Sequence, residues 1–122
     1  MSGMSHEFDI KEYIDVESAL ARVRGNKKLY KRMLGMLKQS EEFLKFDDGL
    51  AAGDLVKAAD AAHGIKGMSG NLGVDKLFHI SEQLMVSLRG GSVDEQLISE
   101  YRAILGKSLE AVDILLSTMS DD

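Results

Sequence analysis

Apolar residues recur at three- and four-residue steps along most of this 122-residue chain, with polar and charged residues between them. That spacing gathers the apolar side chains on one face of an α-helix. Four long segments carry such a stripe, and we expect each to be a helix with one buried face. They run from Asn26 to about Ala52, from Asp54 to Gly73, from there to Gly90-Gly91, and from Ser92 to about Met119.

Local start and stop signals mark the ends of these segments. Side chains that commonly cap helix N-termini stand in front of the stripes; they are Asp15, Asn26 and Asp54. Ser92-Val93-Asp94-Glu95 has the form of a capping box, which predicts the start of the last helix. Gly53 and Gly73 follow stripes and fit helix stops.

The remaining segments are shorter or less regular. Residues 8–14 include four apolar positions that we expect to cover one end of the fold, and residues 15–25 fit a short helix closed by Gly25. Asp47-Asp48-Gly49 interrupts the stripe that starts at Asn26, so we expect it to loosen the last turns of that helix. The polar residues 1–7, with His6, and 120–122 are predicted to be frayed ends.

Short turns between long helices make consecutive helices antiparallel neighbours. The chain has no proline, as long uninterrupted helices require. We therefore expect one all-α domain over residues 1–122, an antiparallel up-down-up-down four-helix bundle. Each helix has a single apolar stripe, which the bundle itself uses, so we expect a monomer.

Composition narrows the possible partners. The formal net charge is −5, and no block of basic residues is present, so nucleic acid is not an expected partner. The chain has no cysteine, which excludes disulfides and the usual structural zinc sites. It contains no apolar run of membrane-spanning length and no pattern of a signal peptide, so we expect no membrane association and a cytoplasmic location.

One histidine stands out within the second long stripe, in the sequence Ala62-His63-Gly64-Ile65-Lys66-Gly67-Met68-Ser69-Gly70-Asn71-Leu72-Gly73. The buried face of this helix is predicted from Leu55, Ala58, Ala62, Ile65, Ser69 and Leu72. His63 lies roughly 130° from the centre of that stripe on a helical wheel, so it faces out of the bundle. An imidazole in this position is accessible to a large partner.

The four glycines of this stretch are unusual in a helix interior, where each costs about 1 kcal/mol relative to alanine. Gly64 and Gly73 lie further round the wheel, where close helix packing is an alternative explanation. Gly67 and Gly70 flank the imidazole, and we interpret them as clearance for a partner. The expected docking surface consists of Val56, Ala59, Asp60, Gly64, Gly67 and Gly70.

The pattern Ala62-His63-x-Ile65-Lys66-Gly67-x5-Gly73 resembles the signature of histidine-containing phosphotransfer (HPt) domains. Gly53-Asp54 and Asn71-Leu72-Gly73 fit as well, and the resemblance extends from about Ile14 to Leu116. It implies a four-helix bundle with a short N-terminal capping helix. It also implies a phosphorelay protein whose partners are response-regulator receiver domains, a hybrid sensor kinase, or both.

The resemblance assigns chemistry to two residues. His63 would accept a phosphoryl group on Nε2 by in-line attack on the acyl phosphate of a receiver aspartate, with Nδ1 keeping its proton. Lys66, one turn further along the same face, would offset the charge of the transferring group. The receiver would supply a magnesium ion, and this chain would need no cofactor. No ATP-binding motif is present in the sequence, so we expect a carrier and not an enzyme.

One position departs from the family pattern. Counting from Gly73 without gaps, Met85 stands where many members have Glu or Gln near the imidazole. Methionine cannot accept a strong hydrogen bond from Nδ1–H. Gln83, two residues away, is then the remaining candidate for orienting the His63 ring.

Other interpretations stay open at this point. The chain could be the phosphoacceptor domain of a hybrid or chemotaxis-type histidine kinase, or a helical-bundle adaptor that binds partners without being phosphorylated. His79 is expected to have no role. A di-iron bundle would need Glu-x-x-His on two helices, and only Asp60-x-x-His63 comes near that spacing, so no metal site is expected.

Overall fold

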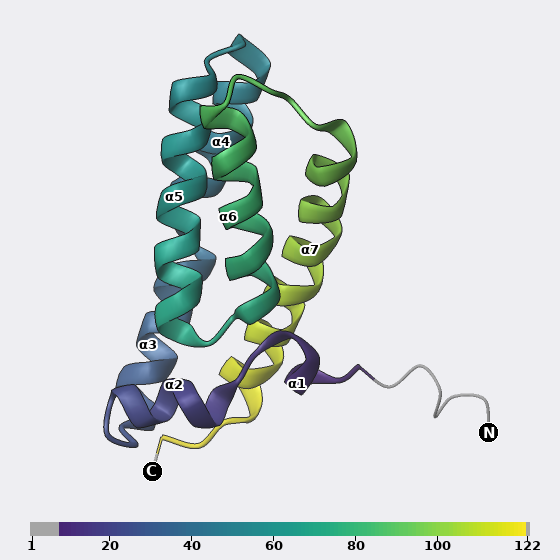
Figure 1. Cartoon of the computed structure of the whole chain (residues 1–122). Coiled ribbons are helices and arrows are strands. Elements are labelled where there is room, and N and C mark those ends of the chain that lie inside the picture. Colours follow the sequence, from purple (N-terminus) through teal and green to yellow (C-terminus); the bar gives the residue numbers. More distant parts are fainter. Residues whose placement is uncertain (1–7, 122) are drawn as a thin grey trace, which may run out of the picture.

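The computed structural model describes residues 8–121, and every regular element in this range is an α-helix (Figure 1). The helices are α1 (Ile10–Tyr13), α2 (Val16–Arg22), α3 (Lys27–Lys38), α4 (Glu42–Ala52), α5 (Leu55–Leu72), α6 (Asp75–Arg89) and α7 (Glu95–Thr118). The predicted all-α class is confirmed. Residues 1–7, predicted to be frayed, lie outside the described range.

The long helices pack side by side around a common apolar core (Figure 1). Helix α5 lies between α4 and α6, α6 also contacts α7, and α7 contacts α3. Because the turns between α4, α5 and α6 are short, these helices run in alternating directions. Fully buried large side chains come from each of these elements: Tyr30 and Leu34 of α3, Phe46 of α4, Ile65 of α5, Leu77 and Leu84 of α6, and Tyr101 and Val112 of α7.

The single helix predicted from Asn26 to Ala52 is wrong, because the chain breaks into α3 and α4. Helix α3 ends at Lys38, with Gln39 as its C-cap, and the hydroxyl of Ser40 accepts a hydrogen bond from the amide of Glu42 (3.2 Å) where α4 begins. The predicted weak point, Asp47-Asp48-Gly49, lies inside α4. A Cβ atom at Gly49 would lie 2.7 Å from the backbone nitrogen of Ala58. Gly49 therefore allows close packing of α4 on α5.

The predicted caps are mostly confirmed. The side chains of Asp15, Asn26 and Asp54 accept hydrogen bonds from backbone amides of the first turns of α2, α3 and α5. The capping box at residues 92–95 is wrong: Asp94 caps α7 by accepting from the amide of Leu97 (3.1 Å). The carboxylate of Asp94, the residue directly before the helix, satisfies this free amide, so the Ser92 hydroxyl is not needed.

Helices α1 and α2 lie near the turn between α5 and α6 (Figure 1). The backbone amide of Asp15 donates to the carbonyl oxygen of Gly73 at 2.8 Å. Close by, the hydroxyl of the fully buried Tyr30 donates to the carbonyl oxygen of Leu72 at 2.8 Å. At the other terminus Asp121, predicted to be a solvated end, forms an ion pair with Lys31 (2.8 Å). These contacts fix the end of the bundle that carries the C-terminus of α5.

Candidate functional site

Helix α5 carries the histidine and is anchored at both ends. Asp54 caps its first turn by accepting from the amide of Lys57 (3.0 Å). Gly73 ends it in the left-handed conformation (φ 75°), which glycine adopts without strain. The buried face consists of Ala58, Ala59, Ala61, Ala62, Ile65, Ser69 and Leu72. The predicted stripe is confirmed except at Leu55, which is half-buried.

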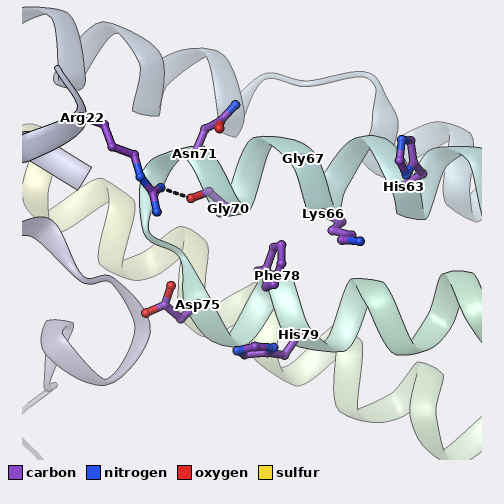
Figure 2. A pocket seen from close by; sticks show the side chains of 9 residues that line it. All are labelled: Arg22, His63, Lys66, Gly67, Gly70, Asn71, Asp75, Phe78 and His79. Atoms are coloured by element: carbon purple, nitrogen blue, oxygen red, sulfur yellow. Dashed lines mark hydrogen bonds between the residues drawn. The ribbon is translucent and has the colours of Figure 1, made fainter. Parts of the chain in front are cut away.

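His63 is exposed on the outer side of α5, as its wheel position predicted. It lines an open depression of about 450 Å³ between α5 and α6 (Figure 2). The other lining residues are Arg22, Lys66, Gly67, Gly70, Asn71, Asp75, Phe78 and His79. No hydrogen bond or ion pair joins the imidazole to any residue between 8 and 121. Both ring nitrogens are therefore open to solvent or to a partner.

The four glycines of α5 and its end have different roles. Gly67 is exposed, and a Cβ atom there would meet nothing within 4 Å, so the space beside the imidazole is open. Gly70, predicted to be clearance for a partner, packs against Phe78, whose ring would lie 3.0 Å from a Cβ atom. Gly64 likewise accommodates the carboxyl group of Glu42, which would lie 2.9 Å from a Cβ atom on this glycine. Within α5, only Gly67 keeps the predicted role without a packing reason.

Two further residues of the expected docking surface are accessible and one is not. Val56 is 72% exposed, and Asp60 is exposed. Ala59 is only 2% exposed, so its assignment to the docking surface is wrong. It lines the space between α5 and the C-terminal end of α6 with Leu88, which places it under the surface.

Lys66 lines the same depression as His63, but its ammonium group contacts α6. Its side chain is directed toward α6 (Figure 2), where Nζ lies 3.9 Å from Oε2 of Glu82 and 5.7 Å from the centre of the Phe78 ring. His63 is one turn back along α5. In the unliganded chain the lysine charge is thus directed at a carboxylate and an aromatic face.

Gln83 of α6, predicted to orient the His63 ring, does not line the depression that contains His63. Gln83 is exposed and lines a separate depression with His79, Glu82, Val86 and Ser87. The contacts of Gly70 with Phe78 and of Lys66 with Glu82 define an antiparallel register that places Met85 opposite His63. Met85 is 8% exposed and belongs to the core. Among the described residues, α6 therefore offers the imidazole no hydrogen-bond acceptor at its own level.

Sequence reasoning missed Glu82, Phe78 and Arg22. Val74 lies in the turn between α5 and α6, and Lys66 and Glu82 are the same number of residues before and after it. Two antiparallel helices bring such positions opposite each other, so this pair of opposite charges could have been predicted from the sequence. The Arg22 guanidinium comes from α2 and donates to the carbonyl oxygen of Gly70 (Figure 2). No sequence signal links these two residues, because their contact depends on how α2 docks. His79, expected to have no role, is exposed, and its ring lies edge-on to Phe78 (centroids 5.1 Å apart).

We compared the sequence of the chain with models of known protein families. The family model described as "Hpt domain" matches residues 32–118 of the chain. The chain belongs to the Hpt domain family. No curated protein and no solved structure matches it. Membership indicates a role in histidine phosphotransfer of two-component signalling, in which Hpt domains interact with receiver domains or kinases and act as phosphocarriers.

The matched segment of this Hpt domain contains α4 to α7 and most of α3, with both His63 and His79. Helices α1 and α2, with Arg22, precede it. In the described part of the chain, no helix is long and apolar enough to cross a membrane. Over the same residues, no three His, Cys, Asp or Glu side chains are grouped so that they could hold a metal ion.

Proposed function

We propose that this Hpt domain accepts a phosphoryl group on His63 from the aspartyl phosphate of one receiver domain and passes it to the aspartate of another. The observation that carries this proposal is the exposure of His63 next to the open space over Gly67. An acyl phosphate lies inside the active site of a folded partner, so the acceptor must project from a surface without bulky neighbours. Of the two described histidines, His63 has an exposed glycine, Gly67, about one turn away on its own helix, whereas α6, which carries His79, contains no glycine.

The proposed step exchanges one bond for another. The lone pair of Nε2 attacks phosphorus, the N–P bond forms, and the P–O bond to the aspartate breaks with its electrons left on the carboxylate. Nδ1 keeps its proton during the attack. The reverse reaction with a second receiver returns the group to a carboxylate. The Lys66 ammonium offsets charge on the phosphoryl oxygens from the Hpt side, and a magnesium ion held by the receiver would do so from the other.

The docking surface follows from which side chains are accessible. Val56 of α5 and Val86 of α6 are large apolar residues that are 72% and 62% exposed. With Asp60 and Gly67, they give a partner both apolar area and access to the imidazole. In this proposal α3 and α4 together occupy one of the four positions of an up-down bundle, and α1 and α2 cap its end.

A free-standing relay protein and a phosphoacceptor domain of a hybrid or chemotaxis-type kinase share this chemistry. A helical adaptor differs, because it would bind through the same surface without phosphorylation.

The test is to mix the chain with a receiver domain carrying labelled aspartyl phosphate and to follow label on both proteins. We expect transfer to the wild type and to His79→Gln, and none to His63→Gln. Equal receiver binding by all three variants without any transfer would favour the adaptor.

A further inference from the structure

The Lys66 ammonium is held on α6 by two side chains that the proposed reaction does not use. Glu82 presents its carboxylate 3.9 Å away, and the Phe78 ring lies with its centre 5.7 Å from Nζ. Packing of Phe78 against Gly70 fixes the ring between the two helices. Lys66 thus has a defined resting position against α6.

This hold is weak. The side chain of Lys66 is 26% exposed and that of Glu82 is 47% exposed, so water screens their attraction. The separation of 3.9 Å is also longer than a hydrogen-bonded ion pair. A ligand of higher charge at the neighbouring position can therefore draw the ammonium away.

A phosphoryl group on His63 would be such a ligand. Residues three apart on a helix have Cβ atoms about 5–6 Å from each other, which a lysine side chain can span by rotation. The phosphoryl group carries nearly two negative charges near neutral pH, whereas Glu82 carries one. Met85, opposite His63, is buried, whereas the Glu82 carboxylate lies 3.9 Å from the Lys66 ammonium, so Glu82 can act at this site through Lys66.

We propose that Glu82 is a positioning residue for Lys66, which holds the ammonium on α6 while His63 is free and releases it when His63 is phosphorylated. This inference rests on the proposed function of His63. Parting Lys66 from Glu82 opposes phosphorylation of His63, so Glu82 shifts the equilibrium back toward the receiver aspartate. The pair favours release of the phosphoryl group by the carrier.

The equilibrium constant for transfer from receiver to His63 tests this directly, because it does not depend on how tightly the proteins dock. Glu82→Gln should raise it about two- to fivefold, the range of a half-exposed ion pair. Lys66→Gln should lower it. In the double variant Glu82→Gln/Lys66→Gln, the effect of Glu82→Gln should disappear.

Asp60→Asn is the matched charge control. Asp60 is an exposed carboxylate one turn before His63, and it forms no ion pair with any residue from 8 to 121. Its removal also lessens repulsion of the phosphoryl group, but this effect should persist when Lys66 is replaced. If the Glu82→Gln effect persists in the same way, or if Glu82→Gln lowers the constant, the positioning role is refuted.

A second measurement needs no phosphorylation. The ¹⁵N chemical shift of Lys66 Nζ in the free protein should change in Glu82→Gln and stay unchanged in Asp60→Asn. An unchanged shift in Glu82→Gln would refute the inference even if transfer works. Failure of wild-type His63 to accept phosphate from any receiver or from the small donor phosphoramidate would instead refute the proposed function.

Discussion

The backbone of Gly73 lies so close to Asp15 that a Cβ atom on the glycine would be 2.5 Å from the Asp15 carbonyl oxygen. Gly73 also has a φ of 75°, in the region that residues with a side chain rarely adopt. The amide of Asp15 donates to the Gly73 carbonyl oxygen at 2.8 Å. This one glycine therefore ends the histidine helix and seats the N-terminal segment against it.

Gly73→Ala should destabilise the fold by at least about 2 kcal/mol, since it adds backbone strain and a steric clash. Urea unfolding followed by circular dichroism measures this change. Gly106→Ala is the control, because Gly106 is exposed inside α7 and a Cβ atom there would meet nothing within 4 Å. That variant should gain up to about 1 kcal/mol. Similar effects of the two substitutions would contradict the assigned role of Gly73.

The space over Gly67 should matter to a large donor more than to a small one. Gly67→Gln places a longer side chain beside His63, and its Cβ atom would meet nothing within 4 Å. We expect it to slow labelling by a phosphorylated receiver at least about tenfold, equivalent to about 1.4 kcal/mol in the barrier. Labelling by phosphoramidate should fall much less. Gly106→Gln controls for a long side chain elsewhere, and equal slowing with both donors would show that Gly67 is not a clearance position.

Buried tyrosines should make the fold sensitive to alkali. Burial raises the pKa of Tyr30 to about 12, with the charges of Asp15 and Asp75 adding to the effect, and burial also raises the pKa of Tyr101. An unfolded tyrosine loses its proton near pH 10, so above that pH the unfolded state binds fewer protons than the folded state. The free energy of unfolding should then fall by about 1.4 kcal/mol per pH unit for Tyr30 until about pH 12.

Tyr30→Phe separates this effect from the hydrogen bond to Leu72. At pH 8 the variant should be less stable by about 1–2 kcal/mol, because the Leu72 carbonyl oxygen loses its donor. Between pH 8 and pH 11 its stability should fall less than that of the wild type. Parallel loss of stability in both proteins, measured by urea unfolding at each pH, would show that Tyr30 does not cause the alkaline sensitivity.

Two buried serines lack hydrogen-bond partners within the described residues. These are the hydroxyls of Ser81 on α6 and Ser108 on α7. Ser81→Ala and Ser108→Ala should each stabilise the fold by about 1 kcal/mol, because an unpaired polar group leaves the core. Ser69→Ala is the matched control, since the Ser69 hydroxyl donates to the carbonyl oxygen of Ile65 (2.6 Å). A thermal melt in which all three variants respond alike would contradict this difference.

The sequence predicts the fold class, which depends on the regular spacing of apolar residues along all the long helices, and the outward direction of His63, which depends on that spacing along α5. It does not predict the break between α3 and α4. Apolar residues keep their helical spacing on both sides of Gln39 and Ser40. The backbone nevertheless turns there, where the Ser40 hydroxyl accepts a hydrogen bond from the amide of Glu42. Such a contact has no periodic signal.

The same distinction applies to the site. His63 and Gly67 could be identified from spacing on one helix. Gly64, Gly70 and Ala59 could not be assigned, because their surroundings are set by Glu42, Phe78 and the end of α6, which reach them only in the packed bundle. The resting position of Lys66 likewise depends on the register between α5 and α6. Contacts between helices could therefore not be predicted from the spacing of residues on a single helix.

The proposed function requires that His63 itself carries the phosphoryl group. The most direct measurement is peptide mapping by mass spectrometry of the wild-type chain after incubation with a phosphorylated receiver, under alkaline conditions that preserve phosphohistidine. We expect one phosphoryl group, acid-labile and alkali-stable, on the peptide containing His63. A phosphoryl group on His79, or on a serine or aspartate with His63 unmodified, would contradict the proposal.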